Sequence, residues 1–202
     1  MLPFTRFLKG LSEEKRNSVK ELGFDGLLGL RIQQNRNVEV IELMRRFCWQ
    51  TQTLRVHGKE LKLTEQLVGR ILGLPYGGRD MMKLKSNLGN VQQKYKVRRE
   101  SRRALIEELS NMETGKEWQA NFILLANHCV LRPSSSLSCS PCRLDFLDDI
   151  SNMREMNWCK YVLDGLCAGA KDLQAQLAEF EKGDRSSLNL KGCTVVLEVR
   201  SC

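Results

Sequence analysis

The chain has 202 residues, of which 42% are hydrophobic and 28% are charged, and its formal net charge is +8. This size and balance are typical of a globular domain, so they exclude an intrinsically disordered chain, a collagen and a coiled-coil rod. No stretch approaches the ~18 consecutive apolar residues of a transmembrane helix, and Pro3, Arg6 and Lys9 interrupt the start, which therefore lacks a secretory signal. We expect one mainly α, intracellular domain over residues 1–202, with no membrane partner.

Four elements are predicted in the first part of the chain. Ser12 can cap a helix over residues 12–22, which ends at Gly23. Apolar residues at helical spacing predict a second helix over residues 40–48. A period of two then predicts the one small β-hairpin, over about residues 53–63. Thr64 suits the N-cap of a further short helix, which must end at the sequence Gly73-Leu74-Pro75.

The middle of the chain carries most of the positive charge. Nine basic and two acidic residues lie between Arg79 and Arg103. The pattern over residues 79–97 is weak and polar and Gly89 interrupts it, so we expect a flexible basic connection there. Residues 98–112 then have apolar positions at helical spacing and predict a helix.

Two apolar stripes predict the core of the domain. The first runs from Trp118 to Cys129, and its helix is apolar almost all round. The second runs from Trp158 to Phe180 in steps of three and four, which predicts the longest helix. The sequence between them is typical of a loop, and the run over residues 193–199 cannot be assigned by its periodicity.

Eight cysteines are too sparse for a disulfide scaffold. We expect Cys48, Cys129, Cys159 and Cys167 to pack as small apolar side chains. Cys139 and Cys142 have the spacing of one zinc knuckle, but a specific zinc signal needs two such pairs. We therefore predict no metal and no cofactor, with Cys139 and Cys142 as weak metal candidates.

No enzyme chemistry is indicated. A cysteine protease needs an imidazole beside its nucleophile, yet the two histidines are His57, in a predicted turn, and His128, whose neighbour Cys129 points about 100° away on the helix. Pyridoxal phosphate chemistry needs a distinctive lysine and a phosphate cup. The glycine-rich stretch of residues 73–78 has no phosphate-loop ending and is typical of a tight turn.

The basic segment over residues 94–103 is the most useful positive feature. It has three interpretations: a solvated helix start, a nuclear import signal, or a phosphate-led nucleic-acid contact in which the tyrosine stacks on a base. The residues concerned are Lys94, Tyr95, Lys96, Arg98, Arg99, Arg102 and Arg103.

Two further stretches carry a resemblance to a known family. Both resemble a transposon-associated region of plant genomes. The first is residues 11–28, which include Leu11-Ser12-Glu13-Glu14 and Gly23-Phe24-Asp25-Gly26. The second is residues 63–78, which end in Leu74-Pro75-Tyr76-Gly77-Gly78. Asn157-Trp158 and Gly192-Cys193 extend the likeness. This region is similar to the aminotransferase-like plant mobile domain, which commonly precedes a cysteine protease domain for ubiquitin-like modifiers.

The resemblance implies a helical, nuclear domain without an assigned activity, and it transfers no catalytic or binding residue. The family's last apolar helix runs further than this chain, which stops at Val199-Arg200-Ser201-Cys202, so we expect a C-terminally shortened copy. We interpret the chain as a non-catalytic interaction module of plant transposon origin with an unknown protein partner. The alternative is weak, non-sequence-specific nucleic-acid binding through residues 94–103.

Overall fold

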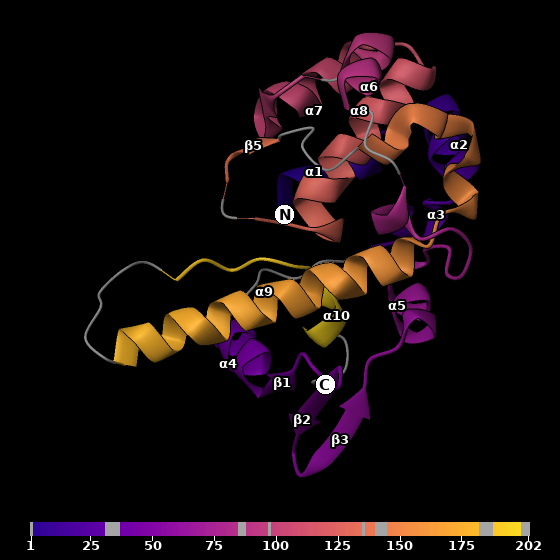
Figure 1. The fold of residues 1–202 in the computed structure, drawn as a ribbon. Coiled ribbons are helices and arrows are strands. Elements are labelled where there is room, and N and C mark those ends of the chain that lie inside the picture. Colours follow the sequence, from indigo (N-terminus) through magenta and orange to yellow (C-terminus); the bar gives the residue numbers. More distant parts are fainter. Residues whose placement is uncertain are drawn as a thin grey trace.

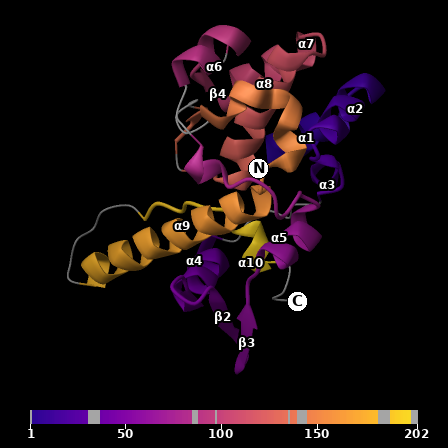
Figure 2. The same cartoon turned by 45° about the vertical axis from the view of Figure 1, so that its right-hand side comes forward.

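The longest helix, α9 (Trp158–Glu181), crosses the computed structural model and divides the other elements into two groups (Figures 1 and 2). The structure describes residues 2–30, 37–84, 88–96, 98–134, 136–139, 145–181 and 188–198. One group lies along the first half of α9 and consists of helices only, apart from a two-stranded pairing of β4 (Glu100–Ser101) with β5 (Ser138–Cys139). The other group holds a small three-stranded sheet and three helices.

The bounds of the remaining elements follow the chain order. The first group comprises α1 (Leu2–Lys9), α2 (Glu13–Glu21), α3 (Asp25–Leu28), η1 (Met81–Lys83), α6 (Leu88–Tyr95), α7 (Arg102–Asn111), α8 (Lys116–Ala126), its π-helical continuation η2 (Asn127–Leu131), and the 3-10 segment η3 (Asp145–Glu155). The second comprises α4 (Asn37–Arg46), β1 (Phe47–Cys48), β2 (Thr53–Val56), β3 (Lys59–Lys62), α5 (Glu65–Leu72) and α10 (Val195–Glu198). The prediction of a mainly α single domain is confirmed.

The predicted β-hairpin is confirmed as β2 and β3, which pair antiparallel from Thr53 opposite Lys62 to Val56 opposite Lys59. His57 and Gly58 both have positive φ, 51° and 73°, as the tight turn of a hairpin requires. The sheet also contains β1, whose two residues pair with β2. A two-residue strand is too short for its periodicity to be recognised in the sequence.

The helix ends follow the local chemistry of the sequence. Ser12 Oγ accepts from the amide of Lys15 at 3.3 Å and caps α2, and Thr64 Oγ1 accepts from the amide of Leu67 at 3.2 Å and caps α5. Gly73 closes α5 in the left-handed conformation, with φ 60°. Both predicted helices are therefore confirmed, because their caps satisfy amides that the helix itself cannot.

The segment between residues 79 and 97 differs from its prediction. Leu88–Tyr95 forms helix α6, so the expectation of an irregular connection is wrong for these residues. Val91 and Tyr95, four positions apart on one face, are 0% and 3% exposed, and this burial stabilises a helix whose sequence is otherwise polar. The next helix, α7, begins at Arg102 and not at Arg98, because Ser101 Oγ caps it by accepting from the amide of Ala104.

The two predicted apolar stripes form the centre of the core. Trp118 and Trp158 are both fully buried, and each indole N–H donates to a backbone carbonyl, of Leu109 at 3.0 Å and of Met153 at 2.8 Å. Trp118 stacks on Phe122, and the edge of Phe24 meets Trp158 with ring centroids 4.7 Å apart. Aromatic contacts of this kind join α3, α8 and the start of α9.

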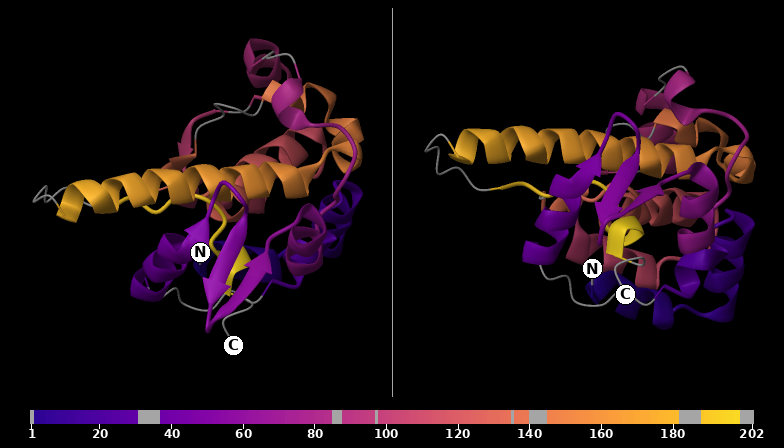
Figure 3. Two further views of the ribbon diagram at one scale, coloured as in Figure 1. Left: turned by 60° about the horizontal axis from the view of Figure 1, so that its bottom comes forward. Right: turned by 90° about the horizontal axis from the view of Figure 1, so that it is seen from below.

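The C-terminal residues complete the second group. Residues 188–191 return along α9, where Lys191 pairs with Asp172 at 3.0 Å. The run that periodicity could not assign forms helix α10, and Val195, Val196 and Leu197 are buried. Seen from below, α10 lies among α4, α5 and the sheet (Figure 3). An isolated apolar segment of this length adopts the conformation that its tertiary contacts select.

The loop that carries the glycine-rich stretch packs against the start of α9. The amide of Cys159 donates to Pro75 O at 3.3 Å, and the amide of Asn157 donates to Arg79 O at 2.9 Å. A Cβ on Gly78 would lie 2.2 Å from Glu155 O, so only glycine permits this approach. Much of the sequence that carries the family resemblance therefore serves packing, in agreement with its interpretation as a tight turn.

None of the helices within the described ranges is long and apolar enough to cross a membrane.

Candidate functional site

Two adjacent hollows lie between α1 and α7 and share Ile106 in their lining. The first, of about 580 Å³, reaches from the start of α1 to η2. The second, of about 330 Å³, continues along the ends of both helices to Lys15. We call the two together the α1–α7 groove. The apolar residues that line it are Pro3, Phe4, Phe7, Leu11, Ile106, Cys129 and Leu137.

Helix α1 supplies one wall of the groove because its apolar residues recur at helical spacing. Phe4, Phe7 and Leu11 are 1%, 7% and 8% exposed, so they are part of the core and present only their edges to the groove. Leu137, in contrast, is 81% exposed and stands at the mouth of the first hollow. Leu137 therefore adds an exposed apolar contact beside the apolar lining of this hollow.

The polar rim of the groove is positively charged. It contains Arg6, Lys15, Arg102 and Arg103, and no described residue that lines either hollow is acidic. Two of these cations stabilise the walls. Lys15 Nζ donates to the carbonyl oxygens of Leu109 and Ser110 at the end of α7, at 2.9 and 2.7 Å.

Arg102 holds the opposite end of the groove by donating to the carbonyl oxygens of Ser134 and Ser136. Arg6 and Arg103 differ, because both are exposed and neither makes an ion pair or hydrogen bond with a described residue. The rim therefore offers two unengaged guanidinium groups to a ligand.

The basic segment predicted from the sequence is only partly assembled as a surface. Tyr95 is 3% exposed, so the prediction that its ring stacks on a base is wrong for this conformation. Lys94 Nζ lies 5.1 Å from the Tyr95 ring centroid. Lys96 and Arg98 pair loosely with Glu117 and Glu108, at 3.7 and 3.8 Å.

The remaining arginines of the segment diverge. Arg99 Nε donates to Ser138 Oγ at 3.2 Å, whereas Arg102 and Arg103 join the rim of the α1–α7 groove. The sequence therefore predicts Arg102 and Arg103 as binding residues, but as part of the basic segment over residues 94–103 and not of the α1–α7 groove. The signal it missed is the spacing of Phe4, Phe7 and Leu11, which is helical and precedes the predicted first helix.

The cysteines within the described ranges fall into two classes. Cys129, Cys139, Cys159 and Cys193 are buried, and desolvation raises the pKa of Cys129 to about 11 and that of the other three to about 12. Cys48 and Cys167 are only half-buried, which departs from the expected packing. Hydrogen bonds from Thr51, with a smaller contribution from the charge of Arg55, lower the pKa of Cys48.

Cys48 is expected to be alkylated first among the described cysteines. A lowered pKa increases the thiolate fraction at neutral pH, and the thiolate is the nucleophile. The measurement is iodoacetamide labelling followed by peptide mass spectrometry, in a variant whose Cys142 and Cys202 are replaced by serine because they lie outside the described residues. Cys48→Ser should remove the fast phase. Faster labelling of Cys129 or Cys139 would contradict the assignment.

The structure assembles no metal centre in the residues it describes, where no three side chains of His, Cys, Asp or Glu converge. Cys139 is fully buried, and Cys142 lies outside the described residues. The expectation of no metal, with Cys139 and Cys142 as weak candidates, therefore stays a prediction at that loop.

Comparison with known proteins gives one result. A family model described as "Domain of unknown function (DUF8566)" matches residues 2–198. No curated protein and no solved structure matches the chain. The match spans both groups of elements and α9, so the groove and the hairpin belong to the same family unit.

Proposed function

We propose a function for this chain, which belongs to the domain family of unknown function DUF8566. It acts as a non-catalytic interaction module that binds acidic, amphipathic peptide segments in the α1–α7 groove. The observation that carries this proposal is the combination of an apolar floor with a rim that holds four cations and, among its described residues, no anion.

The size and composition of the groove favour a peptide. Two hollows of about 580 and 330 Å³ meet at Ile106 and follow α1 and α7, so an extended segment can place one apolar side chain in each. Burying each such side chain supplies about 1.5–3 kcal/mol before the costs of ordering the peptide. Affinity therefore comes from the floor.

The rim supplies the preference for acidic partners. Arg6 and Arg103 stand at the mouth without internal ion pairs, so each can form charge-assisted hydrogen bonds with an Asp or Glu side chain. A basic peptide of the same apolar pattern meets like charge and binds less well. The partner is thus a segment whose apolar residues alternate with carboxylates.

The test is fluorescence polarisation with a labelled peptide of alternating leucine, phenylalanine and glutamate. We expect the double variant Arg6→Glu, Arg103→Glu to bind it about tenfold or more weakly, because each change replaces a charged hydrogen bond with repulsion. The matched control is Lys59→Glu, Lys62→Glu on strand β3, which changes the net charge equally but lies outside the groove. Equal losses in the two variants, or equal binding of a lysine-containing peptide, would overturn the proposal.

Nucleic-acid binding is the second candidate, supported by the exposed cations Lys94, Lys96, Arg98, Arg99 and Arg103. Its affinity for labelled DNA should fall steeply as salt rises, and it should be lost when these residues are changed to glutamine. Peptide binding in the α1–α7 groove should respond less steeply to salt, because only the rim cations contribute charge pairs and the floor is apolar. DNA binding without peptide binding would favour the nucleic-acid function over the peptide-binding function.

A further inference from the structure

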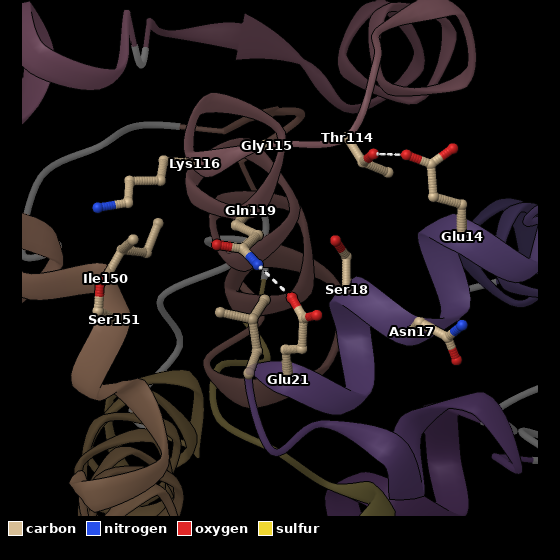
Figure 4. A pocket seen from close by; sticks show the side chains of 11 residues that line it. Glu14, Asn17, Ser18, Glu21, Thr114, Gly115, Lys116, Gln119, Ile150 and Ser151 are labelled. Carbon is tan, nitrogen blue, oxygen red and sulfur yellow. Dashed lines mark hydrogen bonds between the residues drawn. The ribbon is translucent and has the colours of Figure 1, made fainter.

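A third hollow, of about 530 Å³, lies between α2, the first turn of α8 and η3, and it is separate from the α1–α7 groove (Figure 4). Its lining is polar and contains both signs of charge. The floor is apolar, because Leu22 and Ile150 are almost fully buried there. Neither the predicted motifs nor the proposed function uses this hollow.

Its two sides carry opposite charges. On the α2 side, Glu14 accepts from Thr114 Oγ1, and Glu21 Oε2 accepts from Gln119 Nε2 at 3.2 Å (Figure 4). These bonds hold the carboxylates at the hollow, and each leaves further acceptor positions available. On the other side Lys116 extends toward Ile150 and Ser151, and it makes no ion pair with a described residue (Figure 4).

The start of α8 adds hydrogen-bond donors beside Lys116. Its N-cap is Gly115, which has no side chain to cap the helix. The first amide that pairs within the helix is that of Gln119, which donates to Gly115 O at 2.9 Å. The amides of Lys116, Glu117 and Trp118 have no acceptor among the described residues, and together with the helix dipole they favour a negative group.

Ser18 gives independent evidence that the hollow receives a ligand. Its exposed fraction is 8%, and its hydroxyl points between α2 and α8 into the hollow (Figure 4). No described residue forms a hydrogen bond with this hydroxyl. A serine in a helix ordinarily bonds to a carbonyl of the preceding turn or to water in the open. The side chain of Ser18 is nearly buried while its hydroxyl oxygen opens into the hollow, so a polar ligand there can bond to it.

We infer that this hollow binds a small zwitterion of the α-amino acid class with an apolar side chain. A simple anion is disfavoured because Glu14 and Glu21 repel it, and a simple cation is disfavoured by Lys116 and the helix start. A zwitterion satisfies both sides: its carboxylate faces Lys116 and the α8 amides, and its ammonium group faces Glu21, which Gln119 holds against the first turn of α8. The apolar side chain then rests on Leu22 and Ile150.

The test is a titration of the ¹⁵N-labelled chain with L-leucine, observed at the backbone amides of Lys116 and Glu117. We expect saturable shifts of these amides. N-acetyl-leucine lacks the ammonium group and leucine methyl ester lacks the carboxylate, so each should bind about tenfold or more weakly. Inorganic phosphate should produce no saturable shift.

Variants separate the two sides of the hollow. Lys116→Gln and Glu21→Gln should each weaken leucine binding about tenfold, and Ser18→Ala should weaken it while leaving the helix intact. The controls Lys59→Gln and Glu181→Gln remove the same charges elsewhere and should change nothing. The inference is overturned if leucine leaves the α8 amides unshifted, if N-acetyl-leucine or phosphate binds as tightly, or if the controls lose as much affinity as the site variants.

Discussion

Replacing Trp158 with alanine is expected to lower the free energy of unfolding by about 3–5 kcal/mol. The side chain is fully buried at the first residue of α9, where its ring meets Phe24 and Tyr161. Its removal leaves a cavity and also deprives Met153 O of the indole donor at 2.8 Å. Urea unfolding followed by circular dichroism measures the loss, which is a large fraction of the 5–15 kcal/mol that domains usually possess.

The matched control is Trp49→Ala. Trp49 is only half-buried and lies 5.2 Å, ring centroid to Nζ, from Lys171 at the surface of α9. Its removal should cost about 1–2 kcal/mol, because less apolar surface is lost. If the free energy of unfolding falls equally in the two variants, the contact region of α3, η3 and α9 is not the centre of the core.

Replacing Gly26 with alanine is expected to lower the free energy of unfolding by about 3 kcal/mol or more. A Cβ at this position would lie 2.3 Å from both Gly73 Cα and Leu72 O, where α3 meets the end of α5. Both atoms are backbone, so neither can turn aside as a side chain would. In a chain of this size the loss corresponds to a fall of about 6–12 °C in Tm, which differential scanning calorimetry measures.

The control for this variant stands three residues further along. A Cβ on Gly29 would meet Gly26 O at an ordinary 3.7 Å, and its backbone is helical, with φ −93°. Gly29→Ala should therefore be neutral or slightly stabilising, because alanine reduces the conformational freedom of the unfolded chain. A Gly26→Ala protein as stable as Gly29→Ala would show that α3 and α5 do not pack this closely.

The sequence predicts those elements whose stability is encoded locally. Ser12 and Thr64 cap their helices, and Gly73 stops the second one, because the amides and carbonyls they satisfy lie within four residues. The long apolar stripe of α9 likewise predicts its helix from local spacing alone. The sequence does not predict α6 or α10, because the burial of Val91 and Val196 depends on segments far away in the chain.

The candidate site shows the same limit. The charge count identified Arg102 and Arg103, but it could not show that one anchors a loop and the other stands unengaged beside an apolar hollow. The burial of Tyr95 could not be predicted either, because it also depends on packing against distant segments. A groove between α1 and α7 arises from the packing of segments about 100 residues apart, which no local pattern encodes.

The resemblance to the plant mobile domain stays a prediction. The residues that carry it are explained by packing at two places: Gly26 lies against Gly73, and Gly78 lies against Glu155. Close backbone contacts of this kind demand glycine in any chain with this fold. They inform the fold and say nothing of the plant, transposon or nuclear setting that the resemblance implies.

The central claim, that the α1–α7 groove binds acidic amphipathic peptides, is tested most directly at the methyl group of Ile106, which lines both hollows. The chain is labelled with ¹³C at the isoleucine methyl groups and titrated with the glutamate-containing peptide. We expect a saturable shift of the Ile106 resonance, while the resonance of fully buried Ile123 in α8 stays unchanged. An Ile106 resonance that does not move while the peptide binds would contradict this claim.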